Sequence, residues 1–91
     1  MTHTADPLTA QEVGAATFPK PRLGTRGYDI KSVDDALALA ARRLDGRGHL
    51  TAGDIRGIRF HNSSLLSRGY DKDAVDAFMA RVVAAVAELE T

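Results

Sequence analysis

Few side chains in this sequence have the types and spacing that chemistry requires. Zinc ligands come as a closed set of about four, whereas the three histidines lie far apart along the chain. They are His3, His49 and His61. Asp34 and Asp35 form a paired carboxylate, but adjacent helical residues point in different directions and make no acid–base dyad. We therefore expect no catalytic site, no metal and no cofactor.

The other candidate residues lack the neighbouring residues that a catalytic or phosphate-binding motif requires. Ser63-Ser64 lies in no motif that activates a serine nucleophile, and Gly46-Arg47-Gly48 lacks the Gly-Lys-Ser/Thr ending of a phosphate-binding loop. The chain has no cysteine, which removes disulfides and thiolate sites and fits a cytoplasmic location. Twelve basic and 12 acidic residues give zero formal charge, so we expect no nucleic-acid partner.

The elements that would position any site are built by an internal duplication. Leu8-Thr9-Ala10 aligns with Leu50-Thr51-Ala52, an offset of 42 residues that needs no gap. The same offset carries Arg26-Gly27-Tyr28-Asp29 onto Arg68-Gly69-Tyr70-Asp71. It also aligns Val13 with Ile55, Phe18 with Phe60, Leu23 with Leu65, and Val33-Asp34 with Val75-Asp76. We divide the chain into a disordered N-terminus at 1–7, a first repeat at 8–48 and a second repeat at 49–91.

Each repeat begins with a predicted helix cap. Thr9 and Thr51 stand three residues before Glu12 and Asp54, the spacing of a capping box that starts a short helix. An irregular loop follows each short helix, and in the first loop Pro19 and Pro21 bar a regular helix.

The Arg-Gly-Tyr-Asp motif predicts a joint between the loop and a longer helix. Asp29 and Asp71 are N-cap candidates. Tyr28 with Val33, and Tyr70 with Val75, have the spacing of a hydrophobic staple. At Gly27 and Gly69 we expect a sharp turn with positive φ. For Arg26 and Arg68 we expect a hydrogen bond to Asp34 or Asp76, or to a carbonyl, with a lipid phosphate or a protein partner as the alternative.

The longer helices follow from apolar residues that recur every three or four positions. In the second repeat these are Val75, Phe78, Met79, Val82, Val86 and Leu89. We expect helices near 9–16, 30–44, 51–58 and 72–90. The fold class is thus all-α: two tandem short-helix, loop and long-helix units in a compact four-helix arrangement. The two units pair either within one chain, as a pseudo-dimer, or between chains, as a homodimer.

The repeats resemble the N-terminal domain of the DivIVA family. The resemblance rests on Asp54-Ile55, Phe60, Arg68-Gly69-Tyr70-Asp71 and Val75-Asp76-Ala77-Phe78-Met79, and in the first repeat on Phe18-Pro19-Lys20-Pro21 and Leu23-Gly24-Thr25-Arg26-Gly27-Tyr28. It implies a parallel dimer of long helices. It also implies crossing loops that dock apolar and basic side chains on the inner membrane face, and a coiled-coil tail that recruits division or cell-wall proteins.

Two departures from the family pattern change what the resemblance implies. The sequence ends at Thr91, so we expect no filament formation through a long tail. Thr25 and Ser67 stand where the family often has Phe, so membrane insertion would rely on leucines. The candidate residues for binding a membrane or a partner are Lys20, Arg22, Leu23, Arg26, Leu65, Leu66 and Arg68.

The resemblance implies a non-enzymatic adaptor or scaffold in bacterial cell division or polar growth. It would be cytoplasmic, bound to a protein partner such as another DivIVA-type protein, or peripheral at the inner membrane face through weak binding to anionic lipid. We favour the protein partner because the inserting aromatic residue is absent. Two alternatives stay open. One is a helical interaction module unrelated to division. The other is a helical DNA-binding protein, which Arg42-Arg43 supports but the zero net charge counts against.

Overall fold

The protein is helical in the computed structural model, which describes residues 8–64 and 66–90. Four helices are formed: α1 (Ala10–Gly14), α2 (Ile30–Leu44), α3 (Ala52–Arg56) and α4 (Lys72–Leu89). Within the described ranges no strand is present. The expected disorder of residues 1–7 lies outside the described residues.

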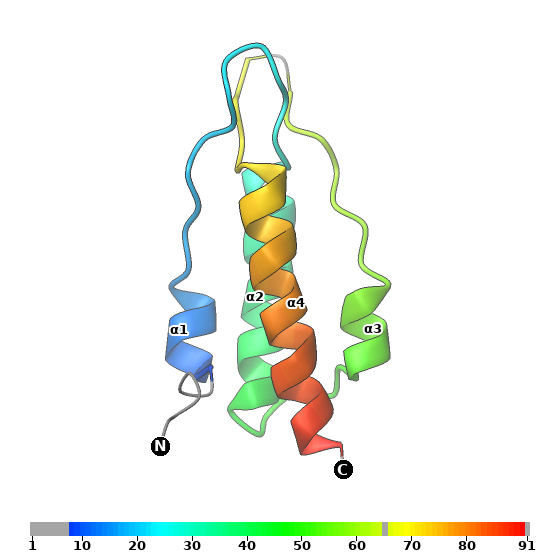
Figure 1. Ribbon diagram of the computed structural model, residues 1–91. Helices are drawn as coiled ribbons and strands as arrows, with labels where there is room; N and C mark the ends of the chain where they lie inside the picture. Colours follow the sequence, from blue (N-terminus) through cyan, green and yellow to red (C-terminus); the bar gives the residue numbers. More distant parts are fainter. Residues whose placement is uncertain (1–7, 65, 91) are drawn as a thin grey trace, which may run out of the picture.

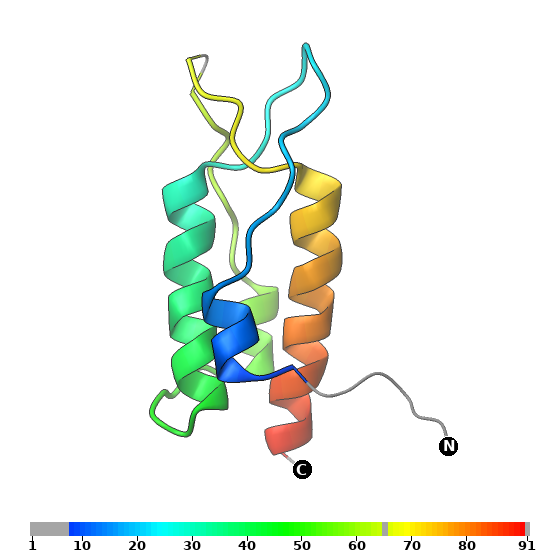
Figure 2. The same ribbon diagram turned by 90° about the vertical axis from the view of Figure 1, so that its left-hand side faces the viewer.

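The two long helices run side by side in the same direction. α2 and α4 both begin at the end of the molecule where the loops lie, and both point away from it (Figures 1 and 2). The short helices α1 and α3 lie on opposite sides of this pair, toward its far end (Figure 1). α1 packs against α2, α3 packs against α4, and α2 contacts α4.

Each helix begins where the sequence places a cap. The Thr9 side chain accepts a hydrogen bond from the Glu12 N–H, and the Glu12 carboxylate accepts one from the Thr9 N–H. Thr51 and Asp54 form the same capping box at α3. The carboxylates of Asp29 and Asp71 accept hydrogen bonds from backbone N–H groups at the starts of α2 and α4. These four predicted caps are confirmed.

The apolar faces of the helices pack together in one hydrophobic core, and both repeats contribute residues to it. Its fully buried members include Val33 and Leu37 from α2, and Val75, Val82 and Val86 from α4. Val13 of α1 and Ile55 of α3 close the core from either side. The phenylalanines at 18, 60 and 78 pack against it while partly exposed. Burying aliphatic side chains of this size contributes about 1.5–3 kcal/mol each, so the core couples the two repeats.

Residues 27–29 and 69–71 cross each other as a short antiparallel pair. The Tyr28 N–H donates to the Tyr70 carbonyl at 2.9 Å, and the Tyr70 N–H donates to the Tyr28 carbonyl at 3.0 Å. The Asp29 N–H donates to the carbonyl of His61, and the Asp71 N–H donates to the carbonyl of Pro19, each at 2.8 Å. These donors and acceptors are equivalent under the 42-residue offset, so each motif is tied to the other repeat in the same way.

The two motifs do not make fully equivalent hydrogen bonds, and one departure lies at a proline. The Ser63 N–H donates to the Gly27 carbonyl at 2.8 Å, but the residue equivalent to Ser63 is Pro21, which has no N–H to donate to Gly69. Gly69 has a φ of 72°, whereas Gly27 is outside the positive-φ region. The prediction of positive φ is therefore confirmed for Gly69 and wrong for Gly27, where close contact with the opposite backbone demands glycine.

The long helices match their expected ranges, but the short ones end early. α2 spans the predicted 30–44 and α4 ends at Leu89 rather than at 90. α1 and α3 end at Gly14 and Arg56, whereas helices to 16 and 58 were expected. The chain leaves each short helix early because the segment after it extends toward the crossing, where the carbonyls of Pro19 and His61 accept hydrogen bonds.

Candidate functional site

The residues predicted to bind a membrane or a partner gather at one end of the molecule. Two loops extend beyond the starts of α2 and α4 (Figure 2). The first comprises residues 20–26, and the described part of the second comprises residues 64 and 66–68; we call them the loop end. Of the candidates on the second loop, Leu65 lies outside the described residues. The six others lie on these two loops, and all are exposed: Lys20, Arg22, Leu23, Arg26, Leu66 and Arg68.

Each loop presents one leucine to solvent. Leu23 is 80% exposed and Leu66 is fully exposed at 100%. In the first loop, Thr25 fixes a tight turn because its N–H and its hydroxyl both donate to the carbonyl of Arg22, at 3.1 and 2.6 Å. Gly24 supplies the positive φ, 85°, that this turn needs. In the second loop, the Ser67 N–H donates to the Ser64 carbonyl at 3.2 Å. Local turns thus hold both leucines outward.

The two loops face each other across a shallow hollow. A cavity of about 340 Å³ is lined by Leu23 and Arg26 from one loop, and by Ser64, Ser67 and Arg68 from the other. The Arg68 guanidinium also donates a hydrogen bond to the carbonyl of Pro21, which ties the loops together. This is the carbonyl bond expected for Arg68. The loop end is therefore one surface made by both repeats.

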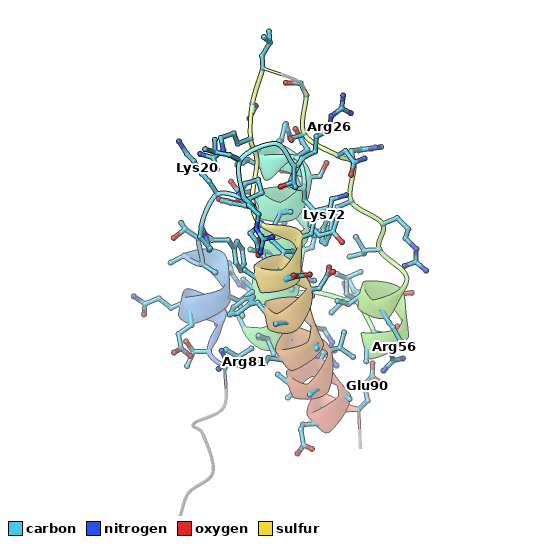
Figure 3. All side chains as sticks on the ribbon, turned by 45° about the horizontal axis from the view of Figure 1, so that its top comes forward. Lys20, Arg26, Arg56, Lys72, Arg81 and Glu90 are labelled. Atoms are coloured by element: carbon cyan, nitrogen blue, oxygen red, sulfur yellow. The ribbon has the colours of Figure 1, made fainter. Side chains whose placement is uncertain are left out.

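The loop end carries basic side chains that form no ion pair with an acidic residue of the described chain. Figure 3, with the loop end turned toward the viewer, shows Lys20 and Arg26 projecting from the first loop. The ion pairs formed within the described chain are Lys31–Asp35 and Arg47–Asp45, both elsewhere. Asp71 and Asp73 line a hollow with Arg22 and Arg26 but form no ion pair with them. The basic side chains are thus available to an anionic surface.

Below the loop end, each tyrosine of the motif contacts the opposite repeat. The Tyr28 hydroxyl donates to Asp76 at 2.8 Å, and the Tyr70 hydroxyl donates to Asp34 at 3.1 Å. The Tyr28 ring lies 5.1 Å from that of Phe60, and the equivalent pair, Tyr70 and Phe18, is 5.0 Å apart. Asp34 and Asp76 therefore bind tyrosines, and the alternative that they bind Arg26 and Arg68 is wrong.

This environment predicts an alkaline titration. Burial, followed by the hydrogen bond to a carboxylate, raises the pKa of both Tyr28 and Tyr70 above 10.0. Because a raised folded-state pKa favours the neutral phenol, each neutral tyrosine stabilises the folded protein. This stabilisation is complete below the unfolded-state pKa of about 10 and is lost as the pH rises through the folded-state pKa. We expect tyrosinate absorbance to titrate above pH 10.0, and the protein to lose stability in the same range.

The chain suits this measurement because its only ultraviolet chromophores beyond Phe are two tyrosines, with no Trp. Tyr28→Phe and Tyr70→Phe each leave a single titrating group and separate the two contributions. A midpoint at or below that of free tyrosine in either variant would contradict the hydrogen bond to the remaining aspartate.

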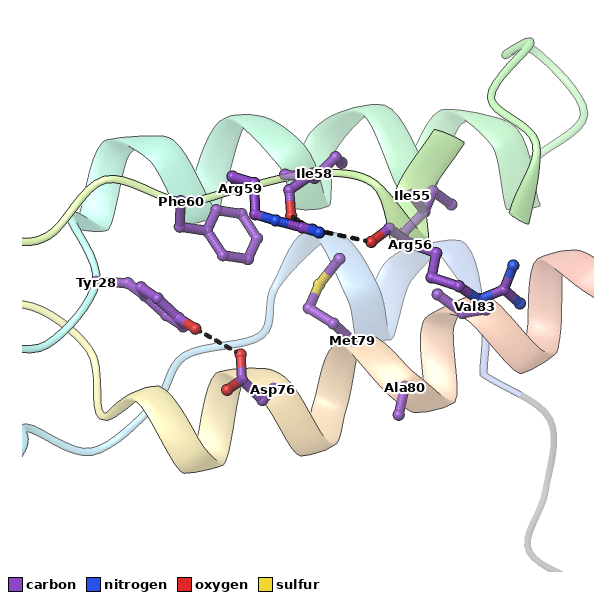
Figure 4. A pocket seen from close by; sticks show the side chains of 10 residues that line it. All are labelled: Tyr28, Ile55, Arg56, Ile58, Arg59, Phe60, Asp76, Met79, Ala80 and Val83. Atoms are coloured by element: carbon purple, nitrogen blue, oxygen red, sulfur yellow. Dashed lines mark hydrogen bonds between the residues drawn. The ribbon is translucent and has the colours of Figure 1, made fainter. Parts of the chain in front are cut away.

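A second hollow, between α3 and α4, was not predicted. It has a volume of about 410 Å³ and is lined by residues of α3, of the segment after it and of α4, together with Tyr28 (Figure 4). Two arginines, Arg56 and Arg59, are among them. A position-by-position comparison of the repeats could have drawn attention to it, because Gly14 and Thr17 occupy the equivalent positions.

Three general features bear on what the molecule can do. No His, Asp and Glu side chains gather in threes as a metal site anywhere in the part of the chain that the structure describes. Across residues 8–64 and 66–90, no helix is long and apolar enough to cross a bilayer. Comparisons with family models, with curated proteins and with solved structures gave no match.

Proposed function

We propose that this protein is a non-enzymatic adaptor of the DivIVA type, serving bacterial cell division or polar growth, whose loop end docks on the anionic inner face of the membrane. One observation carries the proposal: the two loops project from the same end and present Leu23 and Leu66 to solvent beside unpaired basic side chains. An apolar tip surrounded by cations is the combination that inserts into a negatively charged lipid surface.

The arrangement of the repeats supports the comparison with that family. Its members pair two long helices in parallel, with the preceding loops crossing at one end. Here α2 and α4 are parallel, and the backbones of Tyr28 and Tyr70 pair where the loops cross. We propose that the two repeats of one chain take the places of the two chains of a dimer, as a pseudo-dimer.

The exposed leucines favour the membrane as the target of the loop end. The sequence favoured a protein partner because the inserting aromatic residue is missing, yet each loop presents a leucine to solvent close to that position. Burying one leucine contributes about 1.5–3 kcal/mol, and each basic side chain near an anionic surface adds about 1 kcal/mol. The sum gives weak, reversible binding that becomes firm when several copies act together.

Flotation with vesicles tests the proposal. We expect the protein to float with vesicles of phosphatidylglycerol and phosphatidylcholine at low salt, and to stay behind with phosphatidylcholine alone. Leu23→Asp with Leu66→Asp should lower the bound fraction at least tenfold, because both apolar anchors become charges that the lipid repels. Leu65 is left unchanged.

A matched control uses leucines that are exposed elsewhere. Leu39 and Leu89 are both 49% exposed on the long helices, so Leu39→Asp with Leu89→Asp makes the same chemical change away from the loop end. It should leave vesicle binding intact. Equal loss in both variants, or no binding to anionic vesicles at all, would refute membrane docking by the loop end.

A further inference from the structure

The hollow between α3 and α4 is distinct from the loop end. Its floor is apolar, formed by Ile55 of α3, by Ile58 just after α3, and by Met79 and Val83 of α4. Figure 4 shows the Met79 side chain pointing into the space between the two elements. We call it the α3–α4 pocket. Figure 3 shows Arg56, on α3, well away from Lys20 and Arg26 of the loop end.

The duplication shows which side chains distinguish this pocket. Four of the equivalent residues in the first repeat have smaller side chains. A Cβ added to one of them, Gly14, would lie 3.6 Å from the Cβ of Ala41, so α1 and α2 meet closely. α1 also packs more extensively on α2 than α3 does on α4. The second repeat replaces Gly14, Ala16, Thr17 and Ala41 with Arg56, Ile58, Arg59 and Val83. The exchange adds apolar surface and two positive charges at this place.

The two arginines have no acidic partner in the described chain. Both are exposed, and neither forms an ion pair there. The Arg59 guanidinium donates only to backbone carbonyls, those of Arg56 and Ile58, at 3.3 and 3.2 Å. The one carboxylate that lines the pocket, that of Asp76, already accepts a hydrogen bond from the Tyr28 hydroxyl. The pocket therefore combines an apolar floor with a net positive charge.

We infer that the α3–α4 pocket binds an amphipathic helical segment of a protein partner, one that places apolar anchors next to Asp or Glu side chains. The apolar floor takes the anchors, as in other complexes where a helix lies in a groove. Arg56 and Arg59 supply forked donors that match carboxylates. This goes beyond the proposed membrane docking and does not depend on it, since the two surfaces share no residue.

Two labelled peptides of one design test the inference by fluorescence anisotropy with the full chain. Both are amphipathic helices with the same leucine anchors, and they differ only in having Glu or Lys beside the anchors. We expect the Glu peptide to bind at least tenfold more tightly than the Lys peptide, and its binding to weaken as salt is added. Equal or tighter binding of the Lys peptide would overturn the inference.

Substitutions place the binding on this pocket. Arg56→Ala with Arg59→Thr, which takes Arg59 to its first-repeat equivalent, should weaken binding of the Glu peptide at least tenfold. Arg42→Ala with Arg47→Ala removes the same charge from another surface and should have little effect. Ala80→Trp, which fills the pocket without changing charge, should weaken binding of both peptides; circular dichroism confirms that each variant is folded. Unchanged binding of the Glu peptide in the pocket variants would refute the site.

The same variants and peptide distinguish two further outcomes. If the chain alone sediments as a dimer and Ala80→Trp makes it a monomer, a second copy occupies the pocket and the inference is wrong. Leu23→Asp with Leu66→Asp should leave the affinity for the Glu peptide unchanged. A result that refutes membrane docking can therefore be told apart from a result that refutes peptide binding at the α3–α4 pocket.

Discussion

Replacing Gly27 or Gly69 with alanine is expected to destabilise the protein by at least about 3 kcal/mol, the largest effect of any single substitution proposed for this chain. A Cβ at Gly27 would lie 2.2 Å from the Tyr70 carbonyl oxygen, and one at Gly69 would lie 2.3 Å from that of Tyr28. These atoms belong to backbones that pair with each other, so they cannot retreat without breaking the crossing. Gly69 adds the strain of positive φ, about 1–2 kcal/mol for alanine.

Two other glycines separate the causes of this effect. Gly24 has positive φ but open space around it, so Gly24→Ala should cost only the backbone strain of about 1–2 kcal/mol. Gly53 lies in α3, where a Cβ would make ordinary contact with the Thr51 hydroxyl at 3.7 Å. Gly53→Ala should therefore stabilise the protein by about 1 kcal/mol.

Thermal unfolding followed by circular dichroism measures all four variants, since about 1 kcal/mol shifts the midpoint by roughly 4–8 °C in a domain of this size. The predicted order of stability is Gly53→Ala, wild type, Gly24→Ala, and last the two crossing variants. If Gly27→Ala and Gly69→Ala unfold no earlier than Gly24→Ala, the close crossing of the two motifs is contradicted.

Separating the repeats should abolish the fold altogether. Peptides covering residues 1–48 and 49–91 are each expected to lose most of their helical signal, because each repeat buries its core against the other and its motif pairs with the other motif. The short helices have five residues each, far below the length at which isolated helices persist in water. Chains of about 40 residues rarely fold alone.

Mixing the two peptides in equal amounts should restore the helical signal, with a mass equal to one copy of each. A helical homodimer of 49–91 would support the same claim, because that repeat would then take a second repeat as its partner. Circular dichroism with analytical ultracentrifugation distinguishes these results. A fully helical monomer of either peptide would show that the repeats fold independently.

Local sequence signals predict the local structure well. Thr9, Thr51, Asp29 and Asp71 cap the helices expected of them, because a cap depends on residues only three positions apart. The end of α2 also depends on neighbouring residues: Asp45 is its C-cap, and the next residue, Gly46, has a positive φ of 81°.

Contacts between the repeats could not be predicted in the same way. Nothing near Tyr28 in the sequence indicates that its hydroxyl meets Asp76, 48 residues away. Arg68 was expected to bond either a carboxylate or a carbonyl, and only the crossing of the loops brings the Pro21 carbonyl to it. The α3–α4 pocket was missed for a related reason: it depends on how closely a short helix approaches a long one, which the helical period does not report.

The exposure of the loop end also depends on tertiary structure. Leu23, Leu66 and the neighbouring basic residues were identified from the sequence, but their position at a single end follows from the parallel course of α2 and α4. Had the long helices run antiparallel, the two loops would lie at opposite ends and could form no common surface. The proposed membrane docking thus depends on the crossing at Tyr28 and Tyr70.

That crossing can be measured directly by solution NMR of the full chain. We predict slow exchange of the Tyr28 and Tyr70 amide protons with solvent and a nuclear Overhauser effect between them, undiminished when isotope-labelled protein is diluted into a large excess of unlabelled protein. Fast exchange at both amides would contradict the pairing. An effect that disappears on dilution would show that the motifs pair between chains and would contradict the pseudo-dimer.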